Sequence, residues 1–272
     1  MRKISGLLLL SLLLALASCH GSKPDRQRIS VLFVGNSLTY VGNSPAVFEA
    51  LAKANERSAS TDMIVSGGAT LSQRVADGSV AAALKSKHYA YIVVQERGGD
   101  ALCSFGPNSC RDFENAVAAL AKVASENAAH AVLLGSYQNA PASSAALVHA
   151  EGLAAERAAM PYLAVSDLLL KGRTEFPACQ WFYSDGMHPG HDLAFLNSVL
   201  LYKHIYGELP QAVSLTVNAP MYIPKTKFDQ PSPVSHAIAG EELEQKYFYD
   251  TQCTHQIVEL AKQLWDTEAS RR

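Results

Sequence analysis

Apolar residues in this chain gather into five short runs that are rich in Val, Ile and Leu. A strand covered on both faces has no polar side, so it appears as a continuous apolar run rather than as an alternation of apolar and polar residues. The pattern therefore predicts buried parallel strands at residues 29–34, 62–65, 91–94, 131–134 and 161–165.

Ala-rich segments separate these runs and carry apolar residues at helical spacing. In one of them Val117, Leu120 and Val123 fall on one side of a helix, as a helix with a single buried face requires. We expect helices at 44–56, 72–85, 112–127, 143–159 and 240–265, the last with Tyr247, Ile257 and Leu260 in the core. Residues 209–235 contain five prolines and predict an extended excursion over the sheet. Strands that alternate with helices predict an α/β fold with a central parallel sheet of about five strands, covered on both faces.

The first 19 residues have the pattern of an export signal. Arg2 and Lys3 precede an apolar run at 7–16, which is too short to span a bilayer as a helix. Leu-Ala-Ser-Cys at 16–19 resembles a bacterial lipobox, in which Cys19 would be lipidated; a plain cleaved signal is the alternative. We expect a signal peptide at 1–19, a polar tether at 20–28 and a single domain at 29–272. The protein would then be lipid-anchored in the bacterial cell envelope, in the outer membrane, facing the periplasm or the surface.

Charge and size limit the partners. The formal charge of −2 becomes −4 when Arg2 and Lys3 are removed with the signal, so nothing suggests a nucleic-acid partner. About 250 remaining residues suffice for one well-buried core, and we expect a monomer.

Four cysteines remain after Cys19, an even number in a chain predicted to reach an oxidising compartment. Cys103 and Cys110 flank a turn-rich hexapeptide and predict a disulfide, which leaves Cys179 and Cys253 as a second pair whose connectivity the sequence does not fix. A zinc site is a poorer interpretation because the chain has no Cys-x-x-Cys.

Two distant motifs carry the residue types of a catalytic triad. Ser37 follows the first predicted strand, and Asp185 and His188 lie three residues apart in a segment that contains Gly186. A turn there would let Asp185 hold the Nδ1 proton of His188 and leave Nε2 to accept the proton of Ser37. Nucleophile, orienting acid and base together predict a serine hydrolase.

The loops that leave the carboxyl ends of parallel strands form the ligand crevice of such sheets. Ser37, Gly67–Gly68, residues 95–97 and residues 136–137 each follow a predicted strand directly. We therefore expect the site to form from these loops, with Asp185 and His188 contributed by a later one.

Gly-Asn-Ser-Leu-Thr at 35–39 and Asp-Gly-Met-His at 185–188 resemble the first and last sequence blocks of the GDSL/SGNH hydrolase superfamily. Asn36 stands where many members carry Asp. The resemblance implies a flavodoxin-like three-layer α/β/α sandwich, with Ser37 as nucleophile, His188 as base, Asp185 as its partner and no metal or organic cofactor.

The same resemblance implies an oxyanion hole formed by the N–H groups of Ser37 and Gly68. The third block departs from the family pattern, because Gln95-Glu96-Arg97 stands where Gly-x-Asn-Asp is usual. Gln95 would donate its side-chain amide in place of that Asn, or would have a structural role in its loop. Arg97 would bind a substrate carboxylate, or would pair with Glu96 or Asp100.

The function predicted from these residues is hydrolysis of a small-molecule or glycan ester through an acyl-Ser37 intermediate, with carbohydrate O-acetyl groups as a plausible target. Two alternatives remain. Asp185, His188 and His191 are metal-ligand types and suggest a metal-dependent hydrolase, although Pro189 and Gly190 interrupt the spacing. A lipoprotein that binds glycan or peptide on the same fold without catalysis is the other. The sequence also leaves open whether the acyl group passes to water or to another acceptor, because both reactions share the acyl-enzyme.

Overall fold

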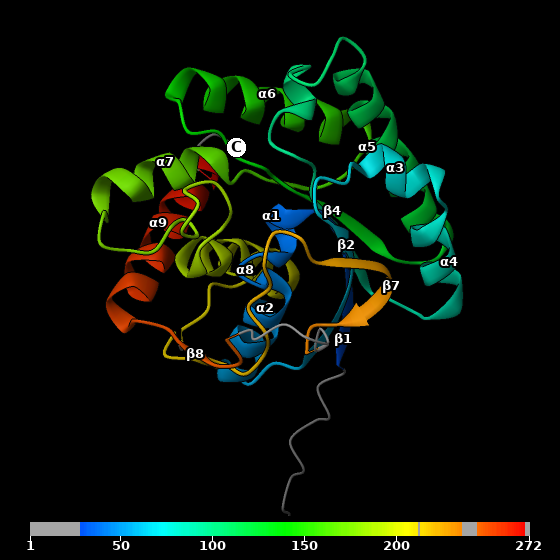
Figure 1. The fold of residues 1–272 in the computed structure, drawn as a ribbon. Helices are drawn as coiled ribbons and strands as arrows, with labels where there is room; N and C mark the ends of the chain where they lie inside the picture. The colour runs from blue at the N-terminus through cyan, green and yellow to red at the C-terminus, as the bar shows by residue number, and fades with distance from the viewer. Residues whose placement is uncertain (1–27, 212, 236–243, 270–272) are drawn as a thin grey trace, which may run out of the picture.

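The computed structural model describes residues 28–211, 213–235 and 244–269, and its central feature is a six-stranded sheet (Figure 1). The strands lie in the order β5-β4-β3-β1-β2-β7. Their bounds are β1 (Ile29–Gly35), β2 (Ala59–Ser66), β3 (Tyr91–Val94), β4 (His130–Leu134), β5 (Tyr162–Leu163) and β7 (Lys227–Pro233). A separate two-stranded sheet pairs β6 (Thr216–Val217) with β8 (Tyr247–Phe248).

Strands β1 to β5 are all parallel, which confirms the predicted sheet. Their spatial order 2-1-3-4-5 is that of a flavodoxin-like fold, and the direction of winding reverses between β1 and β3. The sixth strand was not predicted. It is the antiparallel edge strand β7, which lies within the Pro-rich excursion and pairs with β2. Both of its prolines are accommodated because an edge strand has one side without ladder partners.

Helices cover both faces of the sheet. Helices α2 (Ser44–Ala54), α7 (Ser166–Glu175), α8 (His191–Tyr206) and α9 (Thr251–Ala269) lie on one face, and α3 (Leu71–Ala76), α4 (Ser79–Ser86), α5 (Ser109–Glu126) and α6 (Pro141–Arg157) on the other (Figure 1). Within β1, Val31 and Phe33 enter the first core, whereas Leu32 and Val34 enter the second. This two-sided burial explains why the strand has no polar position in its centre.

Two predicted helices differ from the structure, and helices α7 and α8, which the structure contains, were not predicted. The segment 72–85 forms two helices, α3 and α4, because Gly78 between them adopts a left-handed backbone and the Asp77 side chain accepts a bond from Ser79 N–H at 2.8 Å. The last helix starts at Thr251 rather than at 240, and Tyr247 belongs to β8; residues 236–243 lie outside the described ranges. Helix α8 was not predicted because every residue from Asp192 to Tyr202 is buried, so it has no amphipathic pattern.

The predicted signal peptide, Cys19 and the tether up to residue 27 lie outside the described residues. Within the described residues, no helix is both long and apolar enough to cross a bilayer. The part of the chain that the structure describes contains two disulfides, Cys103–Cys110 and Cys179–Cys253, which join the same cysteines that the sequence analysis paired.

Candidate active site

Ser37 lies at the junction between β1 and the short helix α1 (Ser37–Tyr40), at the carboxyl edge of the sheet. The preceding Asn36 caps this helix, because its side-chain oxygen accepts the N–H of Leu38 at 3.0 Å. The Asn36 amide also donates to the carbonyls of Ala69 and Gln95, at 3.2 and 3.3 Å. One buried side chain therefore joins the loops that follow β1, β2 and β3 and fixes the position of Ser37. The sequence analysis noted Asn36 as a family variation but did not assign it this role.

Asp185 and His188 lie at the tip of a closed loop. Phe182 and Pro189 form an antiparallel bridge, and Tyr183 N–H donates to the His188 carbonyl at 2.8 Å. Gly186 turns the chain at the tip with a φ of 70°, a conformation that favours glycine. The residues named from sequence as Asp-Gly-Met-His thus occupy a tight turn, as predicted from their spacing.

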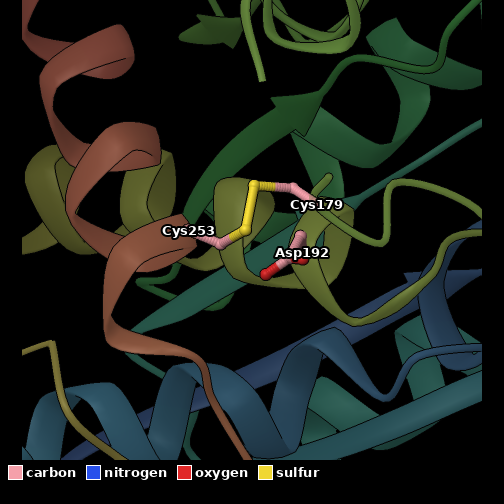
Figure 2. Close-up of side chains that lie close together, drawn as sticks. All are labelled: Cys179, Asp192 and Cys253. Atoms are coloured by element: carbon pink, nitrogen blue, oxygen red, sulfur yellow. A yellow bond between two sulfur atoms is a disulfide. The ribbon is translucent and has the colours of Figure 1, made fainter. Parts of the chain in front are cut away.

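The base of this loop is held to α8 and α9. Asp192, in the first turn of α8, exchanges two hydrogen bonds with Gln180: its carboxylate accepts Gln180 N–H at 2.6 Å, and its own N–H donates to the Gln180 carbonyl at 3.1 Å. Figure 2 shows Asp192 beside the disulfide that links Cys179 to Cys253 of α9. The loop that carries Asp185 and His188 is therefore cross-linked covalently to α9.

The tip is held from a third direction by Tyr137, which follows β4. Its hydroxyl donates to the carbonyl of Met187 at 2.7 Å, and its ring contacts Phe182. Burial, with a smaller contribution from the charge of Asp185, raises the pKa of Tyr137, so its hydroxyl stays protonated and remains a donor.

The Asp185 carboxylate is oriented toward the His188 ring. Its Oδ2 lies 2.6 Å from Nδ1 of His188, while Oδ1 accepts the N–H groups of Met187 and His188, both at 2.9 Å. Burial acts to raise the pKa of Asp185, but the hydrogen bonds from His188 and Met187 outweigh it, and the pKa is lowered. The carboxylate is therefore ionised at neutral pH, and an ionised carboxylate stabilises the His188 tautomer that carries its proton on Nδ1.

Ser37 and His188 line one cleft of about 690 Å³. Gly68, in the loop after β2, lines it too, with open space where a side chain would begin. The Ser37 N–H stands at the first position of α1, where backbone donors have no partner within the helix. The structure thus brings to one cleft the predicted nucleophile, the predicted base and the two residues whose N–H groups are expected to form an oxyanion hole.

Gln95 does not fit the role of oxyanion donor. Its side chain is 1% exposed; Nε2 donates to the Gly135 carbonyl at 3.1 Å, and Oε1 accepts the hydroxyl of Thr39 at 2.9 Å. The amide therefore links α1 to the end of β4, behind the cleft. This geometry favours the structural alternative, and it explains why the chain carries a long amide at the third block.

The neighbours of Gln95 are also held internally. Arg97 donates to both oxygens of Asp100 at 2.7 Å, so the ion-pair interpretation of Arg97 is confirmed with Asp100 as its partner. Glu96 is buried and accepts the N–H groups of Leu71 and Arg97, both at 2.9 Å. Burial raises the pKa of Glu96 to about 7, although these two hydrogen bonds act in the opposite direction.

The geometry does not favour the metal-site interpretation. Across the described ranges, the His, Cys, Asp and Glu side chains form one group of three that is close enough to share an ion, and it consists of Cys179, Asp192 and Cys253. Its two sulfurs are bonded to each other, so neither is a thiolate ligand. Within the described residues, His191 does not form such a group with Asp185 and His188. Its ring stacks on Tyr247 instead, and burial lowers its pKa to about 4.

Comparison with known proteins identifies the fold. A scan against protein-family models finds no match, and a search of curated proteins finds no significant similarity. Several solved structures do match. A protein from Slackia heliotrinireducens, provisionally described as an SGNH hydrolase, is 20% identical with a TM-score of 0.52 and covers 66% of this chain and 100% of its own. The acetylxylan esterase Axe2 from Geobacillus stearothermophilus is 14% identical with a TM-score of 0.53, over 68% of this chain and 97% of its own.

A further match is a DUF4886 family protein from Bacteroides uniformis, which is 14% identical with a TM-score of 0.55, over 67% of this chain and 84% of its own. Identities this low establish architecture rather than activity. The strand order, the position of Ser37 after β1 and these matches agree with one another, and the chain has the fold of the GDSL/SGNH hydrolases.

Proposed function

We propose that the protein is a serine-dependent ester hydrolase in which Ser37, His188 and Asp185 form the triad. The observation that carries the proposal is that His188, with its Nδ1 2.6 Å from the Asp185 carboxylate, lines the same cleft as Ser37. The superfamily fold, whose solved representatives include esterases, supports the same assignment.

In the first half-reaction, Ser37 Oγ attacks the ester carbonyl while Nε2 of His188 takes the hydroxyl proton. The N–H groups of Ser37 and Gly68 stabilise the oxyanion of the tetrahedral intermediate. Collapse breaks the bond to the alcohol oxygen, which leaves with the proton from His188. Water then attacks the acyl-Ser37 ester by the same route and releases the carboxylic acid.

The acylated partner is proposed to be a carbohydrate, with an acetyl group as the acyl part. Two of the matching structures are of Axe2, described as an acetylxylan or acetyl-xylooligosaccharide esterase. The cleft of this chain is open and is bordered by exposed Phe105 and Met187, so a bulky alcohol can approach Ser37. Lipidation at Cys19 would place this activity at a membrane surface of the cell envelope.

The test is hydrolysis of p-nitrophenyl acetate and of O-acetylated sugars by the purified protein and its Ser37→Ala variant. We expect turnover by the wild type and a loss of at least a thousandfold in the variant. EDTA should leave the activity unchanged if no metal takes part. A wild type without activity on any ester, whose glycan binding survives Ser37→Ala, would instead favour the non-catalytic binding protein.

A further inference from the structure

A second cavity, of about 290 Å³, adjoins the catalytic cleft. Arg97 and Phe105 line both spaces, so these two side chains stand between them. Ser37 and His188 line the cleft alone, whereas Thr70, Ser72 and Asp112 line the second cavity alone. A substrate attached at Ser37 and long enough to pass Phe105 would therefore enter the second cavity.

Phe105 is held in place as an exposed ring. It lies in the loop 103–110, which the Cys103–Cys110 disulfide closes. The guanidinium of Arg97 stacks over the ring at 4.1 Å from its centroid, and Asp100 fixes Arg97 by two hydrogen bonds. The residue is nevertheless 59% exposed. A large apolar side chain that is both immobilised and exposed at a cleft is a surface on which a ligand can pack.

Beside the apolar Pro107 and Phe113, the second cavity is lined by several polar side chains. Thr70 and Ser72 contribute hydroxyls that lie 2.8 Å apart, Asn108 contributes an amide, and Asp112 is exposed in the first turn of α5. Hydroxyls both donate and accept, whereas a carboxylate accepts only, so this set matches a ligand rich in hydroxyl groups.

Charge and polarity exclude two other occupants. The positive charge of Arg97 is neutralised by Asp100, and Asp112 adds an exposed carboxylate to the lining, so an anion would meet repulsion. An aliphatic acyl chain would cover the exposed Asp112 carboxylate without replacing its hydrogen bonds to water, at a free-energy cost. A neutral sugar ring avoids both penalties, because it presents an apolar face to Phe105 and hydroxyls to the surrounding groups.

We propose that the second cavity is a sugar subsite, which holds the ring adjacent to the acylated one while Phe105 packs against it. The inference rests on the proposed ester hydrolase and specifies its alcohol as an oligosaccharide. The cleft then holds the acylated ring and the second cavity its neighbour.

Kinetics on a length series test this assignment. The substrates are O-acetylated xylose, xylobiose and xylotriose, the corresponding acetylated glucose, cellobiose and cellotriose, and p-nitrophenyl acetate and octanoate. In the wild type kcat/KM should rise at least tenfold from monosaccharide to disaccharide in one sugar series. Phe105→Ala should abolish most of that rise, mainly through KM, and Asp112→Asn should reduce it.

The matched control is Phe248→Ala. Phe248 is also an exposed Phe with a cation over its ring, Lys246 at 4.6 Å, but it lies in β8 and lines neither cavity. This variant should keep the wild-type dependence on chain length. Equal kcat/KM for all lengths, or a Phe105→Ala loss confined to p-nitrophenyl octanoate, would overturn the subsite.

Binding separates this inference from the proposed function. Titration calorimetry of unacetylated xylotriose and cellotriose against the Ser37→Ala protein requires no turnover. Phe105→Ala in that background should weaken the tighter of the two at least tenfold, and no detectable binding of either sugar would count against the subsite. If p-nitrophenyl acetate is hydrolysed and depends on Ser37, but chain length and Phe105 have no effect, the subsite fails and the hydrolase stands. If sugars bind through Phe105 and no ester is turned over, the hydrolase fails instead.

Discussion

Asp185 Oδ2 lies 2.6 Å from Nδ1 of His188, within a turn whose backbone N–H groups are accepted by the other oxygen of the same carboxylate. One side chain thus builds the turn with Oδ1 and orients the imidazole with Oδ2. The two roles can be separated by replacing Asp185 with Asn, because the Asn side chain keeps one acceptor oxygen for the turn and replaces the other oxygen with an NH₂ donor.

Asp185→Asn should leave the fold intact and remove most of the activity. The Asn oxygen can still accept the N–H groups of Met187 and His188, but its NH₂ would face Nδ1 and favour the tautomer that lacks a base at Nε2. We expect kcat on p-nitrophenyl acetate to fall by roughly 10³- to 10⁴-fold, with a change in melting temperature of no more than a few degrees. A variant that keeps more than a tenth of the wild-type kcat would show that Asp185 does not orient the base.

Ser37→Ala and His188→Ala should each reduce kcat strongly, and the double variant should be no worse than either single one. Residues that act in one proton-transfer unit are non-additive, because the first substitution already disables the step that the second would affect. The measurement is a double-mutant cycle in kcat on one ester. Multiplying losses would place the two residues in separate steps and would contradict a shared triad.

Gln95→Ala distinguishes a structural amide from an oxyanion donor. The Gln95 side-chain amide donates to the Gly135 carbonyl and accepts the hydroxyl of Thr39. All three residues are buried. Removing the amide leaves a buried carbonyl and a buried hydroxyl unsatisfied, which should lower the free energy of unfolding by about 2 to 4 kcal/mol. Urea unfolding measures this. An oxyanion donor would behave differently, with a loss of about 100-fold in kcat and little change in stability.

Much of this architecture could be predicted from local patterns, and the errors have physical causes. The five parallel strands were readable because strands covered on both faces are continuously apolar, and the Asp185–His188 pair because it is contained in four consecutive residues. Helix α8 escaped prediction because its burial is nearly uniform around its axis.

The contacts of Gln95 and Phe105 could not be read from sequence for a different reason. The partners of Gln95 are 40 and 56 residues away along the chain, so only the folded sheet brings them together. Phe105 gave no signal because a single aromatic residue in a turn-rich loop has no periodic pattern. The role inferred for Phe105 depends on the Arg97 guanidinium stacked on its ring and on the two cavities that the ring lines.

Glu96 should make stability depend on pH between about 4.5 and 7. Its pKa is raised by burial to about 7 in the folded protein, against an ordinary value of 4.5. Between these values the folded state holds a proton that the unfolded state has lost, so the free energy of unfolding falls as the pH rises and levels off above 7. The contribution is on the order of 3 kcal/mol.

Glu96→Gln removes the group that titrates, so the stability of this variant is the reference against which the pH dependence of the wild type is measured. The free energies of unfolding in urea of both proteins should be compared at pH 5, 6, 7 and 8. The wild type should lose most of this stability relative to the variant from pH 5 to 7, and the difference should change little from 7 to 8. A difference that does not change with pH would mean that Glu96 is ionised throughout.

Removing each of the two disulfides should lower the free energy of unfolding by a different amount. Cys179 and Cys253 are 74 residues apart and Cys103 and Cys110 are 7 apart, and a longer closed loop restricts the unfolded chain more. Chain entropy predicts losses of about 4 and about 2 kcal/mol respectively. Paired Cys→Ala variants, unfolded in urea, test this order, and a larger loss for the Cys103–Cys110 pair would contradict it. Cys179 is next to Gln180, which is hydrogen-bonded to Asp192 at the base of the loop that carries His188. Removing the Cys179–Cys253 disulfide should therefore also lower kcat at temperatures where the variant remains folded, because a more mobile loop positions His188 less accurately.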